Sequence, residues 1–306
     1  MKRLNRITAV LLVILLCVSL CACKKNNDAQ TQKLVPFDPV VFEGDKFKIT
    51  VLGCEQIKDY NNHDALRVFY DFENKYEVPT SSDEAVSFIA YQNSEEISIA
   101  YPNADYYINE TSNNTLRIYN GVKLRCVQQF SCKVDGGKID VKIVENGNDE
   151  NNIDIEFDLN ALSGAPEKIE SNEYTYNEGY FSYLTESGVI ADYYNVKVLN
   201  SEKIKSADDS DCIRIYYEFT NNSNIDSAFW STVGTRIVVS QGGISLYSVK
   251  PKTTVAEDDN YSENIKPGET IKVSKCYKLT ADSPVYLEIL GLYADDVGKV
   301  FSWFKF

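Results

Sequence analysis

Hydrophobic and polar positions alternate along two stretches of the chain, residues 65–74 and 212–221. The hydrophobic positions are Leu66, Val68, Tyr70 and Phe72 in the first stretch and Ile213, Ile215, Tyr217 and Phe219 in the second. A period of two in β-branched and aromatic residues is typical of a strand with one buried face. Each stretch closes with an asparagine, so the same strand is predicted twice.

The two stretches belong to a longer internal repeat. Residues 47–75 align without a gap to residues 194–222, and ten of these 29 aligned positions are identical. The offset of 147 drifts in the middle of the repeat, where Gln92 corresponds to Gln241, and it returns to 147 afterwards. Two copies indicate a duplicated domain, because a solenoid needs at least three stacked units.

Each copy is predicted to be an all-β unit of about seven short strands. In the first copy these strands are 47–52, 66–72, 86–91, 97–101, 122–130, 139–144 and 153–159. Turn residues separate them, and no stretch after residue 33 shows a sustained helical period. The pattern predicts two tandem immunoglobulin-like β-sandwiches, at 37–160 and 173–306, joined by a linker at 161–172.

The amino terminus carries a membrane-targeting pattern. Three basic residues precede an apolar run at 7–20, which is too short for a comfortable transmembrane helix but suits a signal peptide. Leu20-Cys21-Ala22-Cys23 resembles the bacterial lipobox, and the resemblance implies cleavage of residues 1–22, lipid on the Cys23 thiol and acylation of the new amino terminus. Residues 23–36 are then a polar tether. The alternative is an uncleaved anchor helix. Two or more acyl chains anchor a protein stably, which favours a location on the outer face of the cell membrane.

Charge and cysteine content restrict the partners. Loss of residues 1–22 removes three basic residues and takes the formal net charge from −14 to −17, so nucleic acid is not an expected partner. Five cysteines remain besides Cys23, and they show neither a CxxC motif nor a Cys/His zinc spacing. Cys126 follows the apolar phase of its strand and is predicted to be a core residue. Cys212 and Cys276 lie out of phase with their buried neighbours, and whether they pair stays open.

No catalytic constellation is visible in the sequence. His63 is the single histidine and lies in a polar loop, and no GxSxG, HExxH or GxxxxGK[ST] motif is present. Acidic turns at 148–150, 208–211 and 257–259 offer oxygen ligands, but none matches the twelve-residue calcium loop, so solvated hairpin ends are predicted there. We expect no catalytic residues, no metal and no cofactor.

Four aromatic residues are candidate partner-binding positions. Phe229 and Trp230 follow a strand loop, where they are either a buried plug or an exposed platform. Phe301 and Trp303 occupy the outward phase of the last strand, where the first copy has carboxylates. Either the aromatic run 174–183 covers this patch or it is open to a partner.

Several motifs carry a family resemblance. The segments YYEFTNNS, SQGG and IKPGETIKVSKCYKL, together with Phe229-Trp230 and the lipobox, resemble immunoglobulin-like domains of unknown function in Gram-positive lipoproteins, which are related to telokin-like secreted domains. The first copy departs from this pattern, since it lacks Phe-Trp and has Asn-Gly in place of Pro-Gly. The resemblance implies a fold and an extracytoplasmic location, with no activity attached.

We therefore expect a lipid-anchored, non-catalytic binding or spacer module with a protein or cell-wall partner. The alternative is a carboxylate-based hydrolase acting on cell-wall or glycan substrates.

Overall fold

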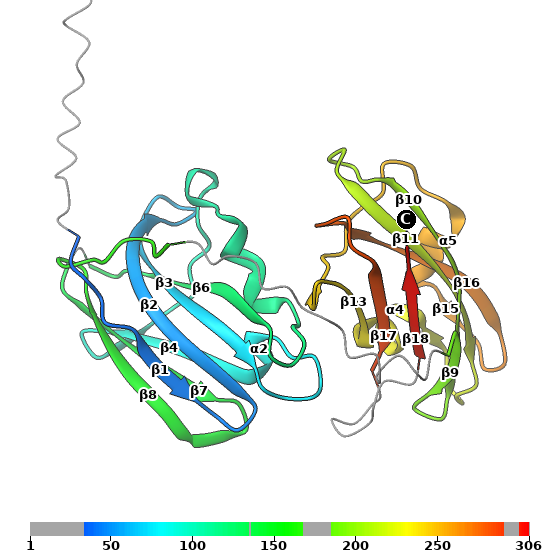
Figure 1. The fold of residues 1–306 in the computed structure, drawn as a ribbon, viewed down its shortest axis with the longest axis horizontal. Coiled ribbons are helices and arrows are strands. Elements are labelled where there is room, and N and C mark those ends of the chain that lie inside the picture. The colour runs from blue at the N-terminus through cyan, green and yellow to red at the C-terminus, as the bar shows by residue number, and fades with distance from the viewer. Residues whose placement is uncertain (1–33, 135, 168–184, 291–299, 306) are drawn as a thin grey trace, which may run out of the picture.

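The computed structural model describes residues 34–134, 136–167, 185–290 and 300–305. Within these residues the chain forms two mostly β bodies that lie side by side (Figure 1). Among the described residues, no helix has the length and apolar character needed to cross a membrane. The predicted signal peptide, residues 1–22, and most of the tether lie outside the described residues.

The first unit is built from two four-stranded antiparallel sheets. One has the strand order β1-β2-β3-β6 and the other β5-β4-β7-β8. The strands are β1 (Val40–Glu43), β2 (Phe47–Lys58), β3 (Asp64–Asn74), β4 (Val86–Gln92), β5 (Glu95–Ile97), β6 (Lys123–Ser131), β7 (Lys138–Glu145) and β8 (Asn148–Asp158). Buried side chains from both sheets, such as Tyr70 of β3 and Val141 of β7, belong to one hydrophobic core. The unit is therefore a β-sandwich.

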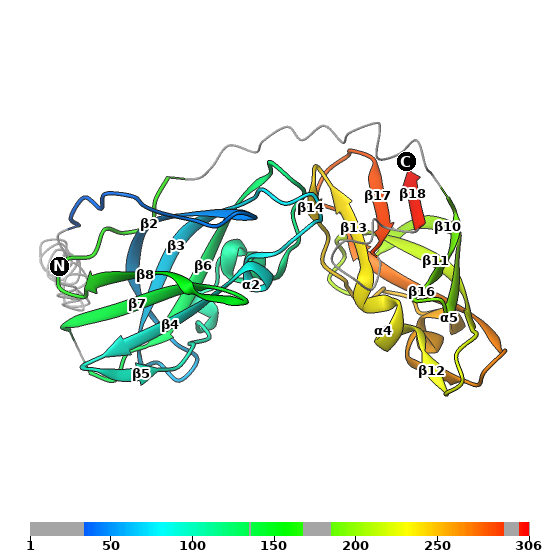
Figure 2. The ribbon, with the colours of Figure 1, turned by 90° about the horizontal axis from the view of Figure 1, so that it is seen from below.

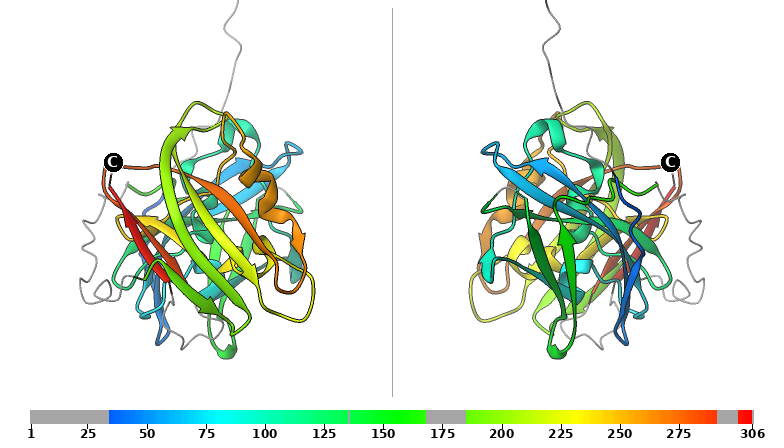
Figure 3. Two further views of the ribbon diagram at one scale, coloured as in Figure 1. Left: turned by 90° about the vertical axis from the view of Figure 1, so that its right-hand side faces the viewer. Right: turned by 90° about the vertical axis from the view of Figure 1, so that its left-hand side faces the viewer.

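The second unit repeats this topology. Its four-stranded sheets have the orders β16-β11-β10-β9 and β14-β13-β17-β18, and β12 pairs with β15 in a separate two-stranded sheet. The strands are β9 (Ser187–Ile190), β10 (Tyr194–Lys205), β11 (Asp211–Asn221), β12 (Ser227–Ala228), β13 (Ile237–Gln241), β14 (Ile244–Ser245), β15 (Asn264–Ile265), β16 (Thr270–Lys278), β17 (Val285–Ile289) and β18 (Val300–Phe304). The two four-stranded sheets enclose a second core. In the left view of Figure 3 this unit is nearest the viewer, with the sheet that contains β10 and β11 in front.

Details of backbone geometry confirm the predicted repeat. The register between β2 and β3 shifts at Val51/Gly53, and the register between β10 and β11 shifts at Val198/Asn200, which is 147 residues later. The side-chain amide of Gln92 donates to two carbonyls of the loop before β7, and that of Gln241 donates to two carbonyls of the loop before β17. Gln92 and Gln241 are thus equivalent, as the drifting alignment predicted.

Asparagines at the ends of β3 and β11 make the same contacts. The Nδ2 atom of Asn74 donates to the carbonyls of Val78 and Ile118, at 3.0 and 2.8 Å. Asn221 donates to Ile225 and Ile265, at 2.8 and 3.0 Å. Because these amides are buried, each satisfies two backbone carbonyls that would otherwise lie unpaired in the interior. This accounts for the asparagine that closes the repeated strand.

The strand predictions need three corrections. The edge strands β1 and β9 were not predicted, because four residues are too few to show a clear alternation. The second hairpin strand, predicted at 97–101, is β5, which ends at Ile97; beyond it a single bridge joins Ile99 to Phe130. The segment that follows forms two 3-10 helices, η1 (Ala104–Tyr106) and η2 (Asn109–Thr115), which carried no helical period.

Helical segments are short in both units. They are α2 (Ser82–Ala85), α4 (Phe229–Thr232), α5 (Ala256–Asp259), η3 (Gly234–Arg236) and η4 (Asn260–Ser262). In α2, Ser81 and Glu84 form a capping box, so even this single turn has satisfied N–H groups. The expectation that no long helix follows residue 33 holds for the described residues.

The two units touch through a short backbone contact, which Figure 2 shows near β14. Ile118 and Ile244 form an antiparallel bridge, and the N–H of Tyr119 donates to the carbonyl of Gly243 at 3.0 Å. The Tyr119 hydroxyl donates to Oε2 of Glu288 at 3.0 Å, and both side chains are buried. Val238 of the second unit even belongs to the core of the first.

The first residues of the predicted linker pack on the first unit. Leu162 is buried in its core, and the carbonyl of Leu162 accepts from the N–H of Val35 at 2.9 Å. The N–H of Cys54 donates to Ser163 Oγ at 2.8 Å. Residues 168–172 of the linker lie outside the described residues.

Candidate functional site

A cavity of about 780 Å³ opens in the first unit between its two sheets. The chain from β5 to β6 crosses from one sheet to the other as η1 and η2, and the cavity lies beside η2. Its size falls in the roughly 300–1,000 Å³ range of small-molecule sites. The crossing therefore leaves room for a ligand.

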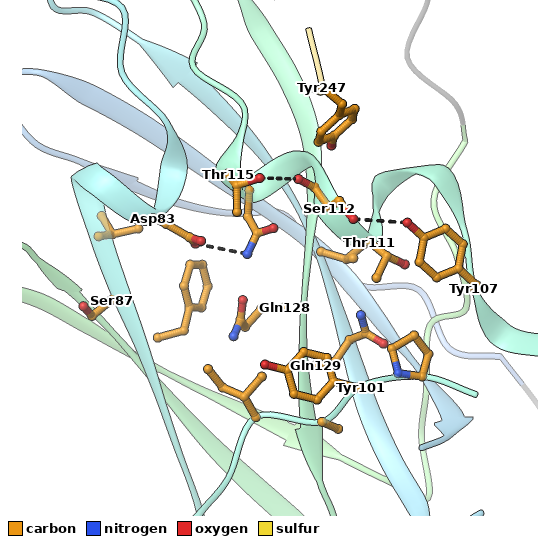
Figure 4. A pocket seen from close by; sticks show the side chains of 17 residues that line it. Asp83, Ser87, Tyr101, Tyr107, Thr111, Ser112, Thr115, Gln128, Gln129 and Tyr247 are labelled. Atoms are coloured by element: carbon orange, nitrogen blue, oxygen red, sulfur yellow. Dashed lines mark hydrogen bonds between the residues drawn. The ribbon is translucent and has the colours of Figure 1, made fainter. Parts of the chain in front are cut away.

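Five segments supply the lining. They are Asp83 with 86–88 at the start of β4, the loop 99–102, residues 107–115 around η2, β6 residues 127–129, and Tyr247 of the second unit. Most of the residues labelled in Figure 4 carry a hydroxyl or an amide. The apolar part of the lining consists of Val86, Phe88, Ile99, Ala100, Pro102 and Val127. The result is a partly apolar cavity with several polar groups directed at one space.

Hydrogen bonds hold the η2 wall in place. Asn114 Nδ2 donates to Oδ1 of Asp83 at 3.0 Å, and Thr115 Oγ1 donates to the carbonyl of Ser112 at 2.9 Å. The hydroxyls of Tyr107 and Ser112 are 3.1 Å apart, and the Tyr247 hydroxyl donates to Oδ1 of Asn113 at 3.3 Å. Figure 4 shows three of these bonds as dashed lines.

One polar atom of the lining is left without a partner. Gln129 is 5% exposed, and its Oε1 finds no hydrogen-bond partner among the described residues. A buried acceptor that is left unpaired costs roughly 1–3 kcal/mol. Figure 4 places Gln128 and Gln129 between Tyr101 and the hydroxyls of η2. Because Oε1 is itself closed to solvent, a donor group of a ligand reaches it only when the Gln129 side chain turns toward the cavity.

The lining is nearly free of charge. Among the described residues that line the cavity there is one carboxylate, Asp83, and no lysine, arginine or histidine. Partial burial raises the pKa of the Asp83 carboxyl, while the hydrogen bond from Asn114 opposes that rise. Such a surface provides no cation for an anionic ligand.

The second unit has bulkier residues at the equivalent positions. At the repeat offset of 147, Asp83, Asn114 and Gln128 correspond to Trp230, Tyr261 and Lys275. The Tyr261 ring packs edge-on against Phe229, with centroids 5.4 Å apart, and Lys275 Nζ lies 4.4 Å from the Tyr261 ring centroid. Burial also raises the pKa of Tyr261 to about 12. Duplication has thus given one unit with an open cavity and one with an aromatic cluster.

Burial separates the four aromatic candidates into two pairs. Phe229 is fully buried against Tyr217 and Phe219. It is therefore a core residue and not part of an exposed binding surface. Phe301 is 4% exposed although it lies in the outward phase, directly across from Glu288. These two side chains cannot contact a partner in this structure.

Trp230 and Trp303 remain candidates on the surface. Trp230 is 50% exposed and Trp303 is 39% exposed, with Lys305 Nζ 4.4 Å from the Trp303 ring centroid. The aromatic run 174–183, which was expected to cover Phe301 and Trp303, lies outside the described residues. Cys23 lies outside them as well.

Cys54, Cys126, Cys212 and Cys276 are free thiols. Cys126 is fully buried in the first core, as predicted. Cys212 and Cys276 are buried on the opposite face of their sheet from the second core, with Cys276 directly across from Arg214. Their out-of-phase positions therefore do not mean exposure. Burial raises the pKa of the Cys276 thiol to about 11.

The acidic segment at 257–259 is not the predicted solvated hairpin end, because it belongs to α5 and the side chain of Asp258 is largely buried against Arg214. The other polar candidates are more exposed. The side chain of His63 is 72% exposed, and its Nδ1 lies 3.7 Å from Oδ2 of Asp59. In the turn at 208–211, Asp208 pairs with Lys278 and Asp209 pairs with Lys252. Within the described part of the chain, no three His, Cys, Asp or Glu side chains are grouped so that they would hold a metal ion.

Sequence reasoning missed the cavity. Its residues are ordinary polar residues in loops and strand ends, and no motif joins them. The signal that could have revealed it was the alignment of the two copies, in which Asn114 is aligned with Tyr261 and Asp83 with Trp230. Small polar residues opposite large aromatic ones indicate a space that one copy fills and the other leaves open.

Fold and cavity together define a class: a duplicated antiparallel β-sandwich protein whose first unit holds a neutral cavity. The chain belongs to the family described as Domain of unknown function (DUF5067), whose model matches residues 22–146 and 171–291. The match covers both copies of the repeat.

A solved structure shows a more distant similarity. It is a Staphylococcus aureus subsp. aureus NCTC 8325 protein described as a candidate lipoprotein, 16% identical, with a TM-score of 0.34. The similarity covers 39% of this chain and 88% of that one. No curated protein matches the chain.

Proposed function

We propose that this chain is a lipid-anchored, extracytoplasmic binding protein without catalytic activity, and that the cavity of its first unit is the ligand site. The observation that carries the proposal is the cavity of about 780 Å³, whose lining brings hydroxyl and amide side chains from five segments to one space. A site of this kind holds a ligand through hydrogen bonds to those groups and through contact with its apolar part. The second unit then serves as a partner for the first or as a spacer.

The sequence motif at residues 20–23 supports the location. A lipid on Cys23 would hold the protein to the outer face of a Gram-positive cell membrane, and the acidic chain would stand off an anionic surface.

An immunoglobulin-like fold is part of the proposal. Such domains place strands A, B and E in one sheet and C, F and G in the other. The pairings β2-β3-β6 and β4-β7-β8 match these two sets, with β5 in the place of C′. The crossing through η1 and η2 then stands where strand D would be, which is why the sandwich is open at the cavity.

The lining favours binding over hydrolysis. Glycosidases of the common type need two carboxyl groups about 5–9.5 Å apart. Asp83 is the one carboxylate among the described residues of the lining. The alternative function is a carboxylate-based hydrolase acting on cell-wall or glycan substrates, and in this cavity it would depend on Asp83.

The anchor is tested by Cys23→Ala. We expect the variant to keep residues 1–22 and to gain no lipid, because the thiol that accepts the lipid is gone, so its mass is that of the unprocessed precursor. Mass spectrometry of the membrane fraction is the measurement, and Cys21→Ala, which alters the cysteine two residues earlier, is the control. A Cys23→Ala protein that is shortened and carries added lipid, as the wild type is expected to be, would contradict lipidation at Cys23.

Binding and hydrolysis are separated by incubating the purified soluble protein with fragmented cell-wall material. We expect wild-type protein to be retained, with no release of product. Asn114→Tyr should lose retention, because it introduces the side chain that the second unit has at this position. Asn61→Tyr, at an exposed loop position of the same unit, is the control. Product release that Asp83→Asn abolishes would replace the binding proposal with the hydrolase.

A further inference from the structure

We infer that the cavity of the first unit takes a neutral, hydroxyl-rich carbohydrate. This inference rests on the proposed function and names the ligand class of the same site. It comes from four properties of the lining: its charge, its donors and acceptors, its unpartnered amide oxygen and its exposed tyrosines.

The charge of the lining disfavours anionic ligands. Phosphate and carboxylate groups are usually recognised by arginine, by lysine or by a set of backbone N–H groups. The described lining has no cationic side chain, and Asp83 repels an anion. A phosphorylated or uronic-acid ligand is therefore disfavoured relative to a neutral one.

The donors and acceptors match a polyol. Hydroxyl side chains and amides each donate and accept, and the lining carries both kinds around one space. Sugar hydroxyl groups also donate and accept, so each finds a partner without a net charge on either side. An apolar ligand would cover the buried amides of Gln128 and Gln129 without offering them a hydrogen bond.

Gln129 adds a requirement for a donor. Its Oε1 accepts from nothing among the described residues. Once the Gln129 side chain turns toward the cavity, a sugar hydroxyl or an acetamido N–H can donate to this oxygen, whereas an ether oxygen or a carboxylate cannot. The ligand is thus expected to present O–H or N–H toward β6.

Exposed tyrosines complete the site. Tyr101 is 76% exposed and Tyr107 is 56% exposed, yet both line the cavity. A tyrosine ring offers a flat apolar face beside a polar hydroxyl, which suits ligands that are apolar on one face and polar at the edge. A pyranose ring has this character, because its C–H groups form faces and its hydroxyls radiate outward. In Figure 4 Tyr101 flanks the space in which Gln128 and Gln129 lie.

The test is calorimetric titration of the soluble protein with triacetylchitotriose and with cellotriose. Glucuronic acid and inorganic phosphate are the anionic comparisons. We expect one of the two neutral trisaccharides to bind and both anions to bind at least tenfold more weakly. Asn114→Tyr should abolish binding, and the control Asn61→Tyr should keep wild-type affinity.

A second variant addresses the amide oxygen directly. Gln129→Met keeps the length of the side chain and removes the acceptor. We expect it to weaken trisaccharide binding about tenfold, the size of one buried hydrogen bond. Circular dichroism establishes that both cavity variants are folded. Unchanged affinity in folded Gln129→Met would contradict the assigned role of the oxygen.

The outcomes distinguish this inference from the proposed function. If neither trisaccharide binds but cell-wall material still retains wild type and not Asn114→Tyr, the cavity binds another ligand class and the carbohydrate inference is wrong. Tighter binding of glucuronic acid or phosphate would also overturn it. If Asn114→Tyr has no effect on retention or on titration, both the inference and the proposed site fail.

Discussion

Replacing Arg214 with alanine is expected to lower the free energy of unfolding by about 3–5 kcal/mol, the typical cost of removing one partner from a buried ion pair. Arg214 is 3% exposed. It donates to Glu202 at 2.8 Å, to Asp258 at 3.0 Å and to the carbonyl of Thr253 at 2.5 Å. Since the side chain of Asp258 is only 12% exposed, the variant leaves a carboxylate poorly solvated and without its cation. Urea denaturation of the full chain measures the loss.

The equivalent substitution in the first unit is the matched comparison. Arg67 is also buried, and it donates to Glu55 at 2.7 Å and to the carbonyl of Tyr106. The position that corresponds to Asp258 is Thr111, so Arg67 has one carboxylate partner where Arg214 has two. We expect Arg67→Ala to cost less than Arg214→Ala. If Arg67→Ala loses as much unfolding free energy as Arg214→Ala, or more, the ion pair with Asp258 does not account for a larger effect at Arg214.

The second large effect is expected at Glu288, where substitution with glutamine should stabilise the protein at alkaline pH. Burial raises the pKa of the Glu288 carboxyl from 4.5 to about 7, while the hydrogen bond from Tyr119 opposes that rise. The folded protein therefore favours the protonated form. One unit of pKa corresponds to about 1.4 kcal/mol, so a shift of this size corresponds to roughly 3 kcal/mol as an upper bound.

The direction follows from the raised pKa. The stabilisation of the folded protein that is linked to protonated Glu288 is fully present below about pH 4.5. It is lost as the pH rises through about 7, because the buried carboxyl group must then ionise. Glu288→Gln does not titrate, so it should match wild type near pH 4.5 and exceed it by up to roughly 3 kcal/mol at pH 8.

Denaturation of both proteins at several pH values between 4.5 and 8 measures this difference. Glu96→Gln, which removes an exposed glutamate, is the control for loss of a surface carboxylate. A Glu288→Gln variant whose stability follows that of wild type across the whole range would show that Glu288 does not titrate there. Because Glu288 and Tyr119 join the two units, the same scan shows whether the contact between the units weakens as Glu288 ionises.

Most of the fold was predictable because the alternating pattern is local. Leu66, Val68, Tyr70 and Phe72 all belong to the first core, as their shared phase predicted. The repeat was equally predictable, because the residues of the long strands keep a constant offset of 147 between the two copies on either side of the region with insertions. The cavity was less readable. It depends on segments that are distant in sequence and come together only where the chain crosses between the two sheets.

The duplication, the succession of the long strands and the face of each strand that enters its core all follow from local residue patterns. What covers the other face of a sheet depends on how distant segments pack. Arg214, Cys212 and Cys276 share the outward phase of β11 and β16, and alternation alone would place them in solvent. They are buried because the segment containing Thr253 and Asp258 lies over this part of the sheet and contacts Arg214. Alternation records which residues share a face, whereas the burial of a second face depends on contacts between residues far apart in the chain.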